Sequence, residues 1–164
     1  MTFEYRIATA DDLEQLWTYN IAANPDEPAW VRWKEQYIGY NRNGQGITFA
    51  VICDDEPVGE GTLLLWPGCS AIQGRMDLAD GKTTGNINAL RIRKAYEGQG
   101  HISRMVKLLE AHARKLGLEK MTIGVEANET RNLAIYLHWG YTRLVRWEQE
   151  DGALILYYEK SLKG

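Results

Sequence analysis

The segment YEGQGHISRMVKLLEAHARKLG, residues 96–117, constrains the fold more than any other part of the chain. Gly98 and Gly100 flank Gln99, and a long amphipathic stretch follows directly. Its apolar residues recur at the i, i+3, i+4 spacing of a helix with one buried face: Ile102, Met105, Val106, Leu109, Ala113 and Leu116. Gly117 then ends the helix. Because the first N–H groups of a helix are unpaired, the bend predicts an anion site, usually for phosphate. A turn without a ligand is the alternative.

Strand and helix patterns alternate along the rest of the chain. Strands are predicted over residues 4–10, 47–55, 57–66, 86–93, 120–127, 141–149 and 153–162. Further helices are predicted over residues 11–23, 28–41 and 129–140, and residues 67–84 form the longest irregular stretch. We expect an α/β (α+β) fold: a mixed, mostly antiparallel twisted sheet of about six to seven strands, with helices on both faces. The central strand, bend, helix and strand predict one parallel pair.

Composition points to an ordinary globular chain. Its 164 residues favour one domain spanning residues 1–164. No apolar run approaches the roughly 20 residues that span a bilayer, and the first residues do not resemble a signal peptide. Cys53 and Cys69 lack CxxC spacing, and the three histidines are not grouped like metal ligands. We therefore expect a cytoplasmic protein with no membrane contact and no metal.

Charge is distributed unevenly along the sequence. Residues 1–60 carry eleven acidic and four basic side chains, a net charge of −7, whereas residues 61–164 carry fifteen basic and eleven acidic ones, a net charge of +4. Within residues 91–120 there are eight basic and three acidic side chains. The basic excess therefore surrounds the glycine bend, which suits an anion site. Chance clustering on solvated faces is the alternative. Because the whole chain is acidic, with a net charge of −3, we expect no nucleic-acid binding.

Two common phosphate motifs do not fit the bend. A Walker loop needs GxxxxGK[ST], which the sequence lacks, and a dinucleotide fingerprint needs a third glycine where this chain has Ser103. Three segments in order do resemble the GCN5-related N-acetyltransferase (GNAT) family: YRIATADDLEQLW, LRIRKAYEGQGHISRMVKLLEAHARKLG and VEANETRNLAIYLHWGY. The family's loop pattern, Arg/Gln-x-x-Gly-x-Gly/Ala, falls on Glu97, Gly100 and Ile102, so that the first and last positions depart from it.

The resemblance implies that acetyl-CoA is the co-substrate. It also implies that the strand over residues 86–93 splays from the strand over residues 120–126, with pantetheine in the gap. Leu90 and Ile92 would then offer backbone groups, and the Leu90 N–H would polarise the thioester carbonyl. The remaining residues that the resemblance places near the cofactor are Arg93, Gly98, Gln99, Gly100, His101, Ile102, Ser103, Arg104, Asn128, Asn132 and Tyr136.

The same resemblance suggests catalytic roles. Tyr136 lies four residues before Gly140, the spacing of the family's general acid, although a packed tyrosine with a bonded hydroxyl is the alternative. Asn128 either caps the following helix, contacts CoA, or does both. Glu60 is the candidate general base, acting directly or through water.

The resulting prediction is an enzyme that moves acetyl from acetyl-CoA to the primary amine of a small molecule, with a homodimer as the common family assembly. A degenerate acyl-CoA-binding module and an acetyltransferase acting on protein or peptide amines are the alternatives. The first 60 residues have a net charge of −7, and the first two predicted helices carry six aromatic side chains, which together predict a cationic acceptor. These aromatic residues are Trp17, Tyr19, Trp30, Trp33, Tyr37 and Tyr40. Aromatic core residues beside a solvated acidic helix face are the alternative.

Overall fold

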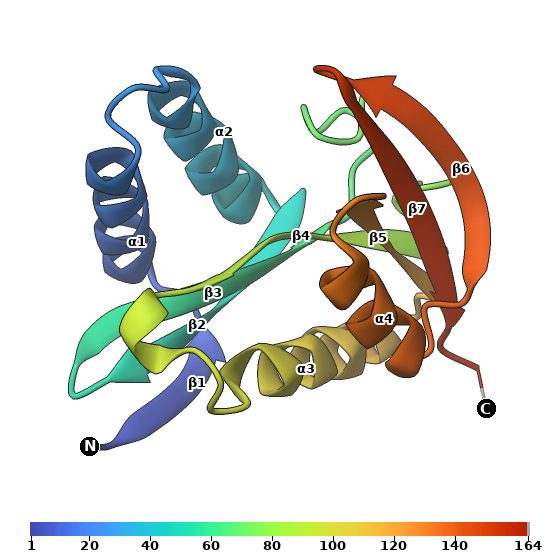
Figure 1. Ribbon diagram of the computed structural model, residues 1–164. Helices are drawn as coiled ribbons and strands as arrows, with labels where there is room; N and C mark the ends of the chain where they lie inside the picture. Colours follow the sequence, from blue (N-terminus) through green and yellow to red (C-terminus); the bar gives the residue numbers. More distant parts are fainter. Residues whose placement is uncertain (164) are drawn as a thin grey trace.

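The computed structural model describes residues 1–163 and contains one seven-stranded sheet in the order β1-β2-β3-β4-β5-β7-β6 (Figure 1). The strands are β1 (Phe3–Ile7), β2 (Gly46–Cys53), β3 (Glu56–Leu64), β4 (Thr84–Ile92), β5 (Lys120–Glu126), β6 (Arg143–Glu150) and β7 (Ala153–Ser161). Only β4 and β5 are parallel, while every other neighbouring pair is antiparallel. The predicted mixed sheet and its central parallel pair are confirmed.

Four α-helices cover the two faces of the sheet. Helices α1 (Ala10–Ala23) and α2 (Ala29–Asn43) lie on one face, and α3 (His101–Lys115) lies on the other (Figure 1). Helix α4 (Thr130–His138) packs against β5, and a short 3-10 turn, η1 (Lys94–Tyr96), precedes the glycine bend. None of the helices within residues 1–163 is long and apolar enough to cross a bilayer.

The apolar face of α3 forms much of the main core. Met105, Val106, Leu109 and Ala113 are all buried against the sheet, as their spacing predicts. Leu116 departs from that prediction, because 48% of it is exposed. It is the C-cap residue and follows Lys115, the last residue of the helix.

The sheet divides where its parallel pair ends. Strand β4 pairs with β5 only from Thr84 to Ile87, opposite residues 120–123. Just beyond, Ala89 has φ +52° and the register between β3 and β4 shifts, which marks a β-bulge. A bulge bends its strand, so β4 diverges from β5, whose later residues pair only with β7. The predicted splay of these two strands is therefore present, and it positions the site described next.

Candidate active site

Three adjoining cavities open around the divergence of β4 and β5. The loop cavity, about 550 Å³, lies between β4, the glycine bend and α4. The central cavity, about 470 Å³, lies between β4 and β5 beneath the β6–β7 turn. The aromatic cavity, about 620 Å³, lies between α1, α2 and β4. Leu90 and Tyr136 line both the loop and central cavities, and Asn88, Ala89 and Asp151 line both the central and aromatic ones. The three spaces therefore adjoin one another across the sheet, and together they are called the path below.

The glycine bend presents backbone donors at one end of this path. Gly98 and Gly100 have φ values of +75° and +85°, a conformation that residues with side chains rarely adopt. Gly100 precedes the first helical residue, and its carbonyl accepts from the Arg104 N–H at 3.1 Å. The N–H groups of residues 101–103 therefore have no acceptor within the helix and are free for an anion. This geometry fits the predicted anion site.

The structure brings six of the predicted cofactor residues together in the wall of the loop cavity. They are Leu90, Ile92, Gly98, Ile102, Asn132 and Tyr136. Glu97 also lines this cavity, and it is exposed to solvent without a salt bridge to any residue of the described range 1–163. Arg91, Arg131, Ile135 and Trp139 line it too and were not predicted. The one signal for Arg131 was its position in the first turn of the helix that carries Tyr136.

Other predicted cofactor residues direct their side chains elsewhere. His101 is only 5% exposed, and its ring lies against Phe3 and bonds the Tyr5 hydroxyl through Nδ1. Arg104 stacks on that same Tyr5 ring, and the Gln99 side chain approaches His101 Nε2 at 3.3 Å. These residues can offer an anion their backbone groups, whereas their side chains brace the bend against β1.

Three more predicted residues lie outside the loop cavity. Arg93 bonds Glu56 at 2.8 Å and lies over the Tyr19 ring, and Ser103 lines a separate cavity beside α4. The capping role of Asn128 is wrong, because α4 has Glu129 at its N-cap and no side-chain capping bond. The chain enters α4 one residue later than that role requires.

Tyr136 stands where the loop and central cavities meet. Its ring contacts Trp139 at a centroid distance of 5.8 Å, and no group within residues 1–163 bonds its hydroxyl. Burial, followed by the nearby Glu129 carboxylate, raises the pKa of Tyr136 above its usual value. The phenol therefore stays protonated at neutral pH and can donate a proton into the path.

Glu60 occupies a different environment. It is 1% exposed beneath α1, its Oε2 accepts from Asn20 Nδ2 at 2.9 Å, and its Oε1 lies 3.7 Å from Arg91 Nη2. Burial raises the pKa of Glu60, against the opposing effects of Arg91 and Asn20. Glu60 lines neither the loop nor the central cavity, so the structure does not bring it together with Tyr136.

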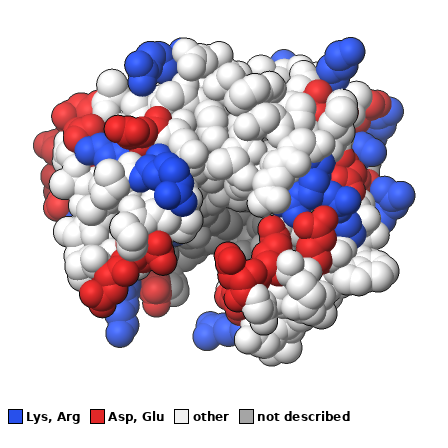
Figure 2. Space-filling model, turned by 90° about the horizontal axis from the view of Figure 1, so that it is seen from above, with Lys and Arg blue, Asp and Glu red and all other residues white. Residues whose placement is uncertain are grey.

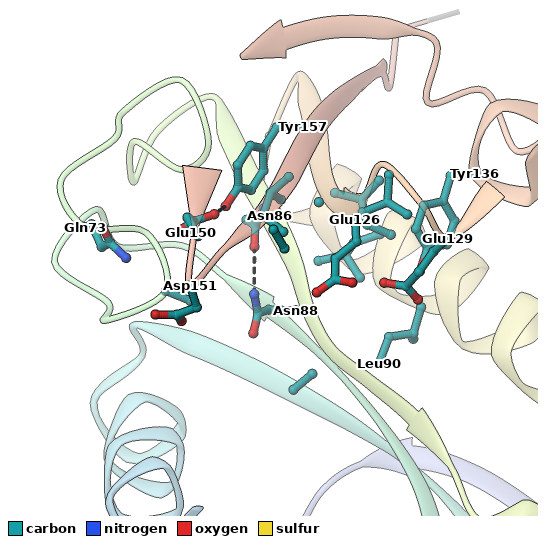
Figure 3. A pocket seen from close by; sticks show the side chains of 18 residues that line it. Gln73, Asn86, Asn88, Leu90, Glu126, Glu129, Tyr136, Glu150, Asp151 and Tyr157 are labelled. Atoms are coloured by element: carbon teal, nitrogen blue, oxygen red, sulfur yellow. Dashed lines mark hydrogen bonds between the residues drawn. The ribbon is translucent and has the colours of Figure 1, made fainter. Parts of the chain in front are cut away.

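Acidic side chains surround the central cavity. Four carboxylates line it, those of Glu126, Glu129, Glu150 and Asp151, and its lining contains no Lys or Arg. Figure 3 shows the first two directed into the same space beside Leu90. Glu150 is already engaged, since it accepts from the Tyr157 hydroxyl at 2.6 Å. Seen from above in Figure 2, acidic side chains lie on both sides of the hollow in this face, with basic side chains near them. The cavity thus favours a positively charged group.

Comparison with known proteins shows the family. The sequence pattern of the Acetyltransferase (GNAT) family matches residues 9–141. Among curated proteins, no sequence matches this chain. The chain belongs to the GNAT family of acetyltransferases, and the sequence-based recognition is confirmed.

Solved structures share the fold at low sequence identity. An N-acetyltransferase from Staphylococcus aureus superposes with a TM-score of 0.71 at 14% identity, covering 99% of this chain and 100% of that one. YncA of Salmonella typhimurium, a putative acetyltransferase solved with acetyl-CoA, gives 0.72 at 14% identity, with 99% and 95% covered. The PaiA N-acetyltransferase of Thermoplasma acidophilum, solved with coenzyme A, gives 0.64 at 17% identity, with 98% and 99% covered.

Proposed function

We propose that this acetyltransferase, whose co-substrate is acetyl-CoA, transfers the acetyl group to the primary amine of a small molecule by direct attack of the amine. The observation that carries the proposal is the position of Tyr136. Its hydroxyl, without a protein partner in residues 1–163, stands at the boundary between the loop cavity and the central cavity. A proton donor at that boundary can serve a reaction between groups that enter from the two sides.

The residues around the loop cavity fit acetyl-CoA. The free N–H groups after Gly100 and the side chain of Arg131 would face its phosphates. Beyond Ile87, β4 has no partner strand on its β5 side, so Leu90 and Ile92 would pair with the amide groups of pantetheine as an added strand does. The exposed Glu97 carboxylate opposes the phosphates only weakly, because solvent screens it.

Acetyl-CoA supplies an activated acetyl group as a thioester. The amine nitrogen forms a bond to the acetyl carbon as the carbon–sulfur bond breaks. Tyr136 gives its proton to the departing sulfur, and the Leu90 N–H polarises the carbonyl oxygen. An acceptor bound as an ammonium group loses two protons, one before it attacks and one as the amide forms. Glu126 and Glu129 are better placed than Glu60 to take the first, because both line the cavity that Tyr136 lines, and the second can return to the Tyr136 phenolate. As a base, Glu60 would have to act through water.

The test measures release of the CoA thiol with a panel of small primary amines, a secondary amide, an alcohol and a short peptide, with product masses determined. We expect amine-dependent thiol release and an N-acetyl product from at least one small amine, and none from the amide or alcohol. Acetyl-CoA binding without turnover of any acceptor would indicate a binding module instead. Turnover confined to the peptide would indicate a peptide-modifying enzyme. The homodimer and the cytoplasmic location remain predictions, which light scattering and cell fractionation would test.

A further inference from the structure

The aromatic cavity already contains a cation of the protein itself. The Arg91 guanidinium lies 5.0 Å from the Trp17 ring centroid and 4.8 Å from that of Trp30. Trp33 contacts Trp30 edge-on at 5.1 Å, and the Tyr37 hydroxyl is bonded to Asn88. Arg91 therefore already covers part of the aromatic surface that was predicted to bind a cationic acceptor.

Arg91 lies beside a buried carboxylate in this wall. Buried Glu60 lies 3.7 Å from its Nη2, and Asn20 fixes Glu60 in turn. Arg32 lines the same cavity and forms no salt bridge within the described residues 1–163. Two guanidinium groups therefore face this space, of which Arg91 is paired with Glu60, and Asp151 is the one carboxylate among the residues that line it. A second ammonium group entering here would meet like charge at close range.

The two ends of the acceptor space thus have opposite preferences. The central cavity, with four carboxylates and no basic side chain, favours an ammonium group beside Tyr136. The aromatic cavity, with Trp30 and Trp33 in its wall, favours a flat apolar body and opposes a second cation. The two cavities are neighbours, because five residues line both: Ala71, Gln73, Asn88, Ala89 and Asp151.

We propose that the acceptor is an aromatic monoamine, with its primary amine in the central cavity and its ring in the aromatic cavity, where Arg91 excludes polyamines. This proposal rests on the proposed function and names the substrate class of the same site. It is more specific than the predicted cationic acceptor, because only the central cavity favours a positive charge and the acceptor should therefore carry one ammonium group.

The first experiment compares 2-phenylethylamine, butylamine and spermidine as acceptors at saturating acetyl-CoA. We expect 2-phenylethylamine to have the highest kcat/KM, by about tenfold over each of the others, because burying a ring against Trp33 adds contact energy. Trp33→Ala should lower kcat/KM for 2-phenylethylamine by about tenfold and leave butylamine within about twofold. The matched control is Trp147→Ala, on the edge strand β6 outside all three cavities, where 65% of the residue is exposed. It should change neither value.

A second variant tests the exclusion by charge. Removing Arg91 alone would leave buried Glu60 unpaired, so both are replaced together in Glu60→Gln/Arg91→Gln. We expect the ratio of kcat/KM for spermidine to that for 2-phenylethylamine to rise at least about tenfold. Calorimetric titration of 2-phenylethylamine into the protein with CoA provides a readout without turnover, in which Trp33→Ala should weaken binding.

The outcomes separate the two proposals. Spermidine preferred over 2-phenylethylamine, or equal losses for Trp33→Ala and Trp147→Ala, would overturn the aromatic monoamine while leaving the proposed function intact. Acetyl-CoA binding with no turnover of any amine would overturn the proposed function itself, and the acceptor proposal with it.

Discussion

Two tyrosines near the end of α4 differ in where their hydroxyl groups lie. The Tyr136 hydroxyl has no partner within residues 1–163, whereas that of Tyr141 donates to buried Glu110 at 2.7 Å. Tyr136→Phe should therefore lower kcat on the order of 10²–10⁴-fold while leaving the melting temperature and acetyl-CoA affinity nearly unchanged. Tyr141→Phe should do the reverse, costing about 1–3 kcal/mol of stability with kcat retained. Steady-state kinetics and thermal melting distinguish the two, and unchanged kcat in Tyr136→Phe would rule out the acid role.

The pH dependence of kcat tests the same residue. A general acid works only when protonated, so kcat falls as the pH rises through its pKa. Burial and Glu129 raise the pKa of Tyr136 above the usual value of about 10, which places this fall above pH 10. Removing the Glu129 charge takes away one of these causes, so Glu129→Gln should move the fall to lower pH. If kcat of the wild type fell near pH 8 and kcat of Tyr136→Phe did not, the pKa of Tyr136 would not be raised, which would contradict the buried environment described for the phenol.

At the scale of the element, the bend before α3 is predicted to bind the co-substrate through its backbone. Gly100 has φ +85° and open space around the position of a Cβ, so Gly100→Ala adds strain without a clash. Gly44, at the end of α2, has φ +73° and equally open space. Both alanine variants should lose about 1–2 kcal/mol of stability. Only Gly100→Ala should weaken acetyl-CoA binding in calorimetry, because only that bend faces the loop cavity. Equal acetyl-CoA affinities in the two variants would show that the bend does not take part in binding.

At the scale of the whole molecule, acetyl-CoA should join the two parts of the divided sheet. Hydrogen exchange should slow at residues 88–92, 98–103 and 124–126 on binding, because those backbone groups gain a partner, whereas β1 and β2 should change little. At acetyl-CoA about a hundredfold above Kd, stability should rise by roughly 2.7 kcal/mol. If acetyl-CoA slowed hydrogen exchange evenly over the whole sheet, the protein would be stabilised in general and the gap between β4 and β5 would not be the binding site.

Local signals predicted most of this architecture, and contacts between distant segments account for what was missed. Apolar spacing and the glycine at position 117 located α3, and the bend before it located the loop cavity. No local pattern could show that Arg91 lies between two tryptophans from α1 and α2, or that His101 turns toward β1. Glu60 illustrates the same limit, because its strand position was predicted, whereas its burial and its bond to Asn20 come from contact with α1, a distant segment of the chain.

The order of substrate binding tests direct transfer most closely. Initial velocities are measured while acetyl-CoA and 2-phenylethylamine, or the best amine of the panel, are varied together. Because both substrates must occupy adjoining cavities before Tyr136 acts, the double-reciprocal lines should intersect. Parallel lines, the pattern of an acetylated enzyme intermediate, would contradict direct attack of the amine.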